Sequence, residues 1–215
     1  MHVTQTGRGR LTRDRVLAGA VEVADDAGIG ALTMRALADH LGVKPMALYH
    51  HVAHKDEILD GIVDLVFGEI ELPIPGGDWA DELRRRARSA RTVLRRHPWA
   101  IGLLENRVTP GPATLRHHDA VLGTLRQAGF SVAMTAHAYA LLDAYVYGFV
   151  VQEISLPFEG QGTAGEVAQT MLAQFPADRY PHLMELMTEH AMRDDYDFGD
   201  EFDYGLDLVI GALSP

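Results

Sequence analysis

The sequence predicts an all-α protein. Apolar residues recur at helical spacing along nearly the whole chain of 215 residues, and alternating strand patterns are scarce. Breaks rich in glycine and proline, at residues 72–77, 109–112 and 158–165, separate the periodic segments. We expect a small N-terminal domain of three helices, residues 1–56, and a larger helical domain, residues 57–215.

The first helix begins near Leu11, and its apolar residues share one face. Gly28 is well placed to cap its C-terminus, because glycine readily adopts the backbone conformation that ends a helix. Thr33 is a suitable N-cap for a second helix over residues 34–41, and Gly42 breaks the pattern. A third helix is expected from Lys44 to about Val52, since proline is accepted in a first turn.

A fourth helix is expected from Lys55 onward, and the helical pattern resumes after each later break. The long segment 131–155 is apolar on most sides, which is typical of a helix buried between others. Beyond the fourth helix, the expected helical segments are residues 78–96, a segment ending near 128, 131–155, 166–174, 179–192 and 198–213.

Composition excludes several classes of protein. Apolar residues make up 47% of the chain, yet no run of 18 uncharged apolar residues predicts a membrane span. The segment Met1–Arg10 is polar and basic, unlike a secretory signal. Because there is no cysteine, disulfides and cysteine-based zinc sites are excluded, which fits a cytoplasmic location.

The net charge of −11 is unevenly distributed. Residues 1–50 hold six basic and five acidic residues, whereas residues 178–207 hold ten acids and two arginines. Most of the excess negative charge therefore lies outside the N-terminal segment. A protein that is acidic overall can still bind DNA when its basic groups converge on one face.

Residues 33–52 have the pattern of a helix-turn-helix, two short helices joined by a tight turn that contains glycine. Small and apolar residues, including Ala38, allow the two helices to pack closely. In such a motif the N-terminal residues of the second helix enter the major groove of DNA. Lys44 can reach phosphate or guanine, and Met46 or Ala47 can touch a thymine methyl group.

Residues 12–70 resemble the N-terminal domain of TetR-family repressors. The residues that carry this resemblance are Ala27-Gly28, Leu32-Thr33, Arg35, Leu37-Ala38, Leu41-Gly42-Val43, Leu48-Tyr49, His51-Val52, Lys55 and Ile58-Leu59. The sequence departs from the family at Lys44-Pro45, where a Ser or Thr cap is common, and at His54. Residues 78–213 are similar, more weakly, to tetracycline-repressor-like regulatory domains, but Gln152 stands where tetracycline repressors have a glutamate and no matching histidine ligands are found.

The resemblance implies a homodimer that binds a palindromic operator and is released by a small hydrophobic effector. The residues expected at the DNA are Thr33, Met34, Arg35, Lys44, Pro45, Met46, Ala47, Tyr49, His50, His51 and Lys55. The expected ligand pocket comprises Trp99, Leu103, Leu104, His118, His137, Leu141 and Tyr145; the last three repeat every four residues on the long helix. The residues expected in the dimer interface are Tyr147, Val151, Leu206, Val209 and Ile210.

Other interpretations are weaker. The arginine run 84–96 could be a second nucleic-acid patch, but pairing with acids such as Asp81 and Glu82 is favoured. We expect no metal or cofactor, because no three histidine or acidic ligands converge in one stretch, and the acidic run 194–203 lacks the spacing of a calcium loop. No enzyme motif is present. A ligand-independent architectural DNA-binding protein, or an activator, stays open as an alternative.

Overall fold

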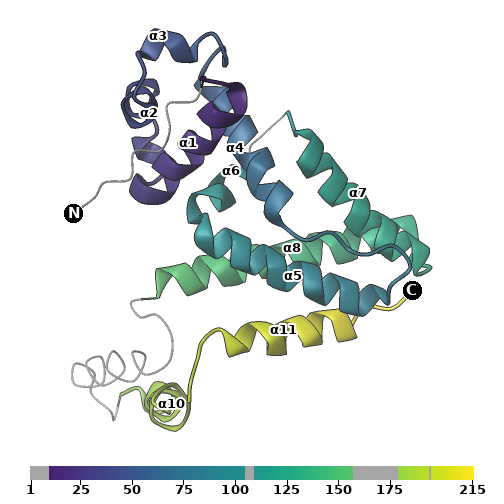
Figure 1. Cartoon of the computed structure of the whole chain (residues 1–215). Helices are drawn as coiled ribbons and strands as arrows, with labels where there is room; N and C mark the ends of the chain where they lie inside the picture. The colour runs from purple at the N-terminus through teal and green to yellow at the C-terminus, as the bar shows by residue number, and fades with distance from the viewer. Residues whose placement is uncertain (1–9, 105–108, 157–178, 194) are drawn as a thin grey trace. The chain divides into compact units, whose positions relative to one another are not determined.

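The computed structural model describes residues 10–104, 109–156, 179–193 and 195–215. Every regular element within these ranges is helical, which confirms the predicted class (Figure 1). The chain divides into two compact units: residues up to 72 with 92–120, and residues 73–91 with 121–215. The domain boundary expected after residue 56 therefore falls inside the first unit.

The first unit begins with four helices, and the caps predicted at Gly28 and Thr33 are present. Thr12 accepts a hydrogen bond from Arg15 N at the start of α1, Arg13–Ala27, and Gly28 ends this helix with φ of +78°. Thr33 accepts one from Ala36 N and begins α2, Met34–Leu41. The unit continues with α3, Pro45–Leu48, and α4, Lys55–Glu69.

Two glycines allow α1 to pack closely against its neighbours. A Cβ atom at Gly19 would lie 2.7 Å from a methyl carbon of Leu41, at the end of α2. A Cβ atom at Gly61 of α4 would lie 2.6 Å from a methyl carbon of Leu17, which is itself buried in α1. A side chain at either position would have to displace Leu41 or Leu17, so the two glycines let α2 and α4 approach α1 closely.

The first unit also contains the 3-10 turn Pro98–Ala100, the short helix α6, Ile101–Leu104, and the N-terminal half of α7, Pro112–Gln127. His97 and Trp99 are buried here, 4% and 8% exposed. Asp64 of α4 accepts bonds from both the backbone N and the hydroxyl of Thr114, at 2.8 and 2.9 Å. These contacts join the start of α7 to the middle of α4.

The second unit is organised around α8, Val132–Ser155, with Ser131 as its N-cap. It also contains most of α5, Trp79–Arg96, and α11, Asp200–Gly211, beside α10, Pro181–Leu186, and the π-helical turn Met187–Ala191. The helix expected over 179–192 is thus split between α10 and this turn. The helix expected over 166–174 lies outside the described residues.

The arginines of α5 pair with acids of the second unit. Arg91 makes two bonds to Glu153 of α8, at 2.9 and 2.5 Å, and Arg88 bonds Asp203 of α11 at 2.7 Å. Arg86 is 1% exposed and lies 2.8 Å from Asp143. The interpretation of this run as a paired helix surface is confirmed, with one arginine in the core instead of at the surface.

None of the helices in the described ranges combines the length and the apolar character that a membrane crossing demands. In the same ranges, no three histidine, aspartate or glutamate side chains lie together as ligands of one ion.

Candidate nucleic-acid interface

The turn between α2 and α3 holds the helix-turn-helix together. Gly42 adopts the left-handed conformation, with φ of +67°, and Val43 N returns to Ala38 O at 2.9 Å. Leu37, Ala38 and Leu48 are fully buried, so α2 and α3 share one core. These contacts fix the orientation of α3 relative to α2.

The recognition helix α3 is shorter than predicted. It begins at Pro45, after Lys44, whose side chain makes no capping bond, and ends at Leu48 instead of Val52. Both His51 N and Val52 N bond the carbonyl of Leu48, at 2.8 and 3.0 Å. The chain tightens at this point because Val52 is 2% exposed and belongs to the core.

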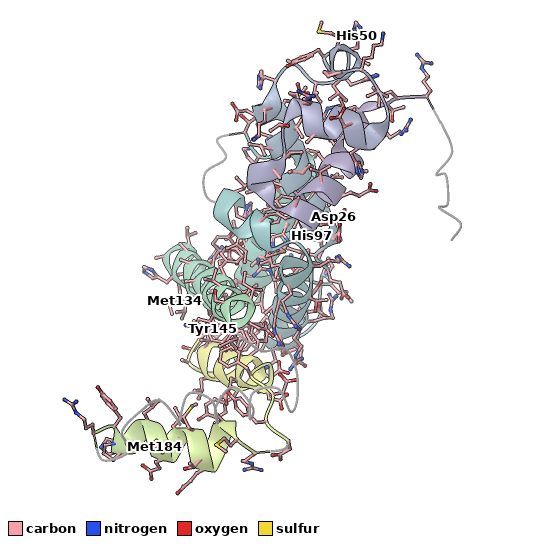
Figure 2. The ribbon with its side chains drawn as sticks, turned by 90° about the vertical axis from the view of Figure 1, so that its left-hand side faces the viewer. Asp26, His50, His97, Met134, Tyr145 and Met184 are labelled. Carbon is pink, nitrogen blue, oxygen red and sulfur yellow. The ribbon has the colours of Figure 1, made fainter. Side chains whose placement is uncertain are left out.

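The predicted DNA-contacting side chains surround α3 on the surface of the first unit. Met46 is 71% exposed and Tyr49 47% exposed, although both are large and apolar or aromatic. His50 lies at the outer end of the α1–α4 bundle, just after α3 (Figure 2). Lys44, Pro45, His50 and Lys55 are exposed, while Ala47 and His51 are half-buried. An exposed rim of this kind on a buried anchor, Leu48, suits insertion into a groove.

The first turn of α2 lies in the same unit. Thr33 and Arg35 are exposed and Met34 is half-buried. Arg35 Nε lies 4.0 Å from Asp39 Oδ2, a wholly exposed contact. Exposed pairs of this kind contribute little to stability, so Arg35 can exchange this partner for a phosphate.

The start of α4 presents Lys55 and is held by a reciprocal cap. His54 Nδ1 accepts a bond from Glu57 N at 3.2 Å, and Glu57 Oε2 accepts one from Ala53 N at 2.8 Å. The Ala53 N–H, and then Arg13, lower the pKa of Glu57 below its usual value. His54, which departs from the family pattern in sequence, therefore does the same capping work as the usual Ser or Asn.

The charges of this surface favour a polyanion. Within the described ranges, Lys44 and Lys55 make no contact with an acidic side chain, so both ammonium groups face solvent. Arg13 is engaged by Glu57 at 3.4 Å. Two free cations near one protruding helix are suited to phosphate contacts, which dominate the affinity of proteins for DNA.

The predicted ligand residues divide between the two units. Trp99, Leu103, Leu104 and His118 belong to the first, where Leu103, Leu104 and His118 are half-buried. His137, Leu141 and Tyr145 belong to α8 in the second. Tyr145 turns toward α11, donating to Phe202 O at 2.9 Å, whereas His137 and Leu141 are exposed. The first four predicted ligand residues thus lie in the first unit and the last three in the second. That all seven line one pocket stays a prediction.

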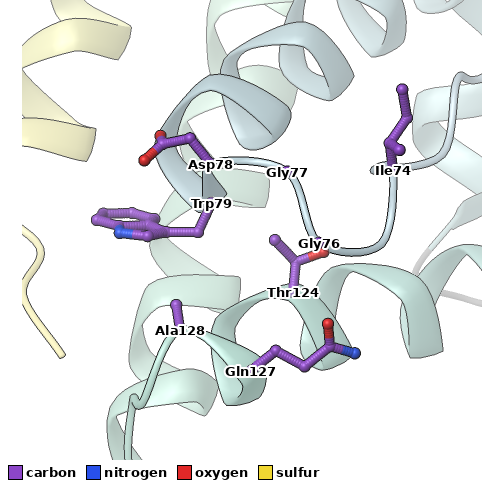
Figure 3. Close-up of a pocket in the computed structure, with 8 residues that line it drawn as sticks. All are labelled: Ile74, Gly76, Gly77, Asp78, Trp79, Thr124, Gln127 and Ala128. Atoms are coloured by element: carbon purple, nitrogen blue, oxygen red, sulfur yellow. The ribbon is translucent and has the colours of Figure 1, made fainter.

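A separate pocket of about 280 Å³ lies in the second unit (Figure 3). It is formed by the turn before α5 and the end of α7, with Thr124 and Gln127 facing Gly76 and Gly77. It contains none of the residues predicted to bind a ligand.

The predicted dimer residues have different environments. Leu206 and Ile210 are 0% and 2% exposed, so they face the core of the second unit and are not at its surface. Val151 is 45% exposed, and Tyr147 and Val209 are half-buried. The apolar residues that α11 exposes are Tyr204, 68%, and Leu208, 60%. They lie on the opposite face of α11. Helical spacing alone could not show which of the two apolar faces is exposed.

Sequence reasoning missed one cluster, at the end of α1. Asp25 accepts bonds from His97 Nδ1 at 2.8 Å and Trp99 Nε1 at 2.6 Å. Glu69 of α4 bonds Arg96 and lies 3.4 Å from His97 Nε2. The sequence marked Asp25 only as part of a helix end, because its partners lie more than seventy residues away and no local pattern signals them.

Comparison with known protein families finds two matching models that together span most of the chain. Residues 16–62 match the model of bacterial regulatory proteins of the tetR family. Residues 72–214 match the tetracycline repressor-like C-terminal domain.

The chain is also similar over its length to characterised and solved proteins. An HTH-type transcriptional regulator of Saccharopolyspora erythraea is 35% identical over 95% of this chain and 85% of its own length. The HTH-type transcriptional repressor DrrR1 of Streptomyces coeruleorubidus is 32% identical over 94% and 77%. The crystal structure of ActR of Streptomyces coelicolor in complex with actinorhodin has a TM-score of 0.74 and 31% identity, covering 94% of this chain and 96% of that one.

Proposed function

Because the chain belongs to the TetR family of bacterial transcriptional regulators, we propose that it is a ligand-responsive repressor. It binds a palindromic operator as a homodimer in the cytoplasm, where bacterial DNA lies, and a small organic effector releases it. The observation that carries the proposal is α3, which exposes Lys44 and Met46 around a buried anchor, Leu48.

In this proposal the operator is read at two levels. Lys44, Met46 and Ala47 face base edges in the major groove, where a cation recognises guanine and an apolar group recognises the thymine methyl. The remaining contacts fix the position of α3 through the phosphates. The residues proposed to contact phosphate are Arg35, Tyr49, His50, His51 and Lys55, with Thr33 and Met34 beside them at the start of α2. Pro45 has no N–H to donate and lies with the major-groove residues of α3.

The dimer uses the exposed apolar face of α8 and α11. Val151 and Ile154 of α8 and Tyr204 and Leu208 of α11 are each more than 40% exposed in the single chain. Apolar side chains of this size on two neighbouring helices are stabilised by a second copy. A two-fold dimer in turn matches the symmetry of a palindrome.

The effector binds residues of the larger helical domain, with Trp99, Leu103, Leu104, His118, His137, Leu141 and Tyr145 as candidates. These side chains are mostly apolar and carry no permanent charge, which favours a neutral, flat or hydrophobic molecule. ActR has been solved with actinorhodin and with (S)-DNPA, which supports a small organic effector for this chain.

Release from DNA requires that the effector prefer one conformation of the DNA-binding helices. Asp25 offers a route, because the C-terminal end of α1 is bonded to His97 and Trp99, just before α6. A ligand that moves this segment changes the hydrogen bonds of α1, which packs on α2 and α4.

The proposal is tested by selecting binding sites for the full-length protein from random-sequence duplex DNA. The expected result is one enriched two-fold symmetric site, with half-sites about one helical turn apart. Enrichment of asymmetric sites, or of no sequence at all, would contradict operator recognition and favour an architectural protein. A reporter gene behind the selected site then distinguishes repression from activation.

A further inference from the structure

We propose that the groove between α1, α4 and the N-terminal half of α7 binds a small organic cation with an apolar body, at a site separate from the effector pocket. The groove lies within the first unit and has a volume of about 640 Å³. It shares no residue with the predicted ligand set. Its lining includes Val21, Glu22, Asp64, Leu65, Glu69 and Arg116.

The floor of the groove is apolar and close-packed. Val21 of α1 and Leu65 of α4 flank it, and Leu65 is 41% exposed. A Cβ atom at Gly68 would lie 3.7 Å from the Cβ of Ala113, so α4 and α7 approach closely at the base. An aliphatic or aromatic group laid along this floor would remove apolar surface from water.

The charge of the lining selects the sign of the ligand. Three carboxylates line the groove, those of Glu22, Asp64 and Glu69, and they stand against two guanidinium groups, Arg116 in the lining and Arg96 bonded to Glu69, which leaves one negative charge in excess. Each carboxylate makes its contacts through only one of its two oxygens. Glu22 Oε2 bonds His40, and Asp64 Oδ1 bonds Thr114. Glu69 likewise uses Oε2 for Arg96 and His97. Within the described ranges the second oxygen of each accepts nothing. A protonated amine can therefore make charge-assisted hydrogen bonds there, which are stronger than those of a neutral alcohol, whereas a carboxylate has no donor to offer.

Occupation of the groove would reach the DNA-binding helices by two contacts. Glu22 bonds His40 of α2 at 2.6 Å. Glu69 belongs to the cluster in which His97 and Trp99 bond Asp25. A cation that competes for Glu69 would alter the contacts of Arg96 and His97. This consequence rests on the proposed function, whereas binding in the groove does not.

The experiment uses the full-length protein with methyl-labelled valine and leucine, and three probes of equal chain length: n-hexylammonium, 1-hexanol and hexanoate. We expect n-hexylammonium alone to shift the methyl resonances of Val21 and Leu65 in a saturable manner. Glu22→Gln should weaken its binding about tenfold, because a hydrogen bond to a charged group is lost. Asp26→Asn, an exposed acid on the same helix outside the groove, is the matched control and should leave binding unchanged.

Other results would overturn the proposal. Equal binding of 1-hexanol would mean an apolar groove without charge selection, and preferred binding of hexanoate would mean an anion site at Arg116. Loss of n-hexylammonium binding in Asp26→Asn as well would mean unspecific attraction to an acidic surface. The indole N–H resonance of Trp99, assigned with Trp79→Phe, tests the link to Asp25. Binding of n-hexylammonium in the groove without a shift of this resonance would refute the link between the groove and Asp25. This outcome is independent of whether the protein is a repressor.

Discussion

The indole Nε1 of Trp99 donates a hydrogen bond of 2.6 Å to Asp25 Oδ1, which joins the last turn of α1 to the segment before α6. The same oxygen accepts a bond from His97 at 2.8 Å. Both donors are buried, so one carboxylate satisfies two side chains that water cannot reach. Helix α1, on which the helix-turn-helix packs, is thereby tied to a segment that carries three predicted ligand residues.

Removing this carboxylate should destabilise the protein. We expect Asp25→Ala to lower the free energy of unfolding by about 2 kcal/mol, because two buried donors lose their acceptor. Asp26→Ala, an exposed neighbour (Figure 2), should change it by less than about 0.5 kcal/mol. Urea unfolding followed by circular dichroism measures both. Equal effects of the two substitutions would show that the Asp25 bonds contribute nothing beyond surface charge.

Local chemistry explains which parts of the fold the sequence could predict. Thr33, Gly42 and Ser131 each cap or end a helix through bonds to residues within a few positions, so their roles are readable from neighbours. The helix-turn-helix was predictable for the same reason. The length of α3 was not, because its end depends on the burial of Val52 in a core formed by distant helices.

Distant partners explain what was missed at the site. The bonds of Asp25 and the ion pair of Arg86 with Asp143 join residues more than fifty positions apart, and no spacing rule connects them. Helical periodicity showed that α11 has two faces with apolar residues. It could not show that Leu206 and Ile210 face inward while Tyr204 and Leu208 face outward, since that depends on how α11 packs on α8.

The two classes of DNA contact should respond differently to substitution. Lys55→Ala should weaken binding to all sequences and reduce the slope of log affinity against log salt by about 1.8 per dimer, for two lost phosphate contacts. Tyr49→Ala should also weaken binding to all sequences. Lys44→Ala and Met46→Ala should instead change which operator is preferred. Fluorescence anisotropy across a salt series, with matched and mismatched duplexes, separates the two patterns. If neither Lys44→Ala nor Met46→Ala changed the preferred operator, these two side chains would not contact the bases.

The reciprocal cap of α4 gives a third prediction. His54→Ala should destabilise the protein by about 1 kcal/mol through loss of an N-cap acceptor, whereas His54→Asn should restore most of it. Because the pKa of Glu57 is lowered in the folded state, its contribution is present above its usual pKa of 4.5 and is lost as pH falls below that value. Glu57→Gln should therefore flatten the acid side of the stability profile measured by thermal unfolding. An equally steep profile in this variant would assign the acid sensitivity to other carboxylates.

Dimer formation should depend on the outer face of α11. Leu208→Glu should yield a folded monomer, because Leu208 is 60% exposed in the single chain and a charge there opposes burial against a second copy. Leu115→Glu on α7, 55% exposed, is the control and should remain dimeric. Leu206→Glu should unfold the second unit instead, since that side chain is fully buried. Sedimentation velocity at micromolar concentration distinguishes these outcomes, and a dimer of Leu208→Glu would place the interface elsewhere.

The effector pocket is tested best at Tyr145 and His137. Tyr145→Phe keeps the ring and removes the hydroxyl that bonds Phe202 O at 2.9 Å, so it isolates the link between α8 and α11. His137→Leu removes a polar side chain that is exposed on α8, at little cost to folding. His137→Leu should need a higher effector concentration for release from operator DNA, by roughly fivefold to tenfold, as expected for one lost hydrogen bond to the effector. Tyr145→Phe should raise that concentration only through the weakened α8–α11 link, because its hydroxyl is bonded to Phe202 O. Ala136→Ser, an exposed neighbour on α8, serves as the control. Release at an unchanged effector concentration by well-folded variants would move the pocket away from α8, toward Trp99 and α6.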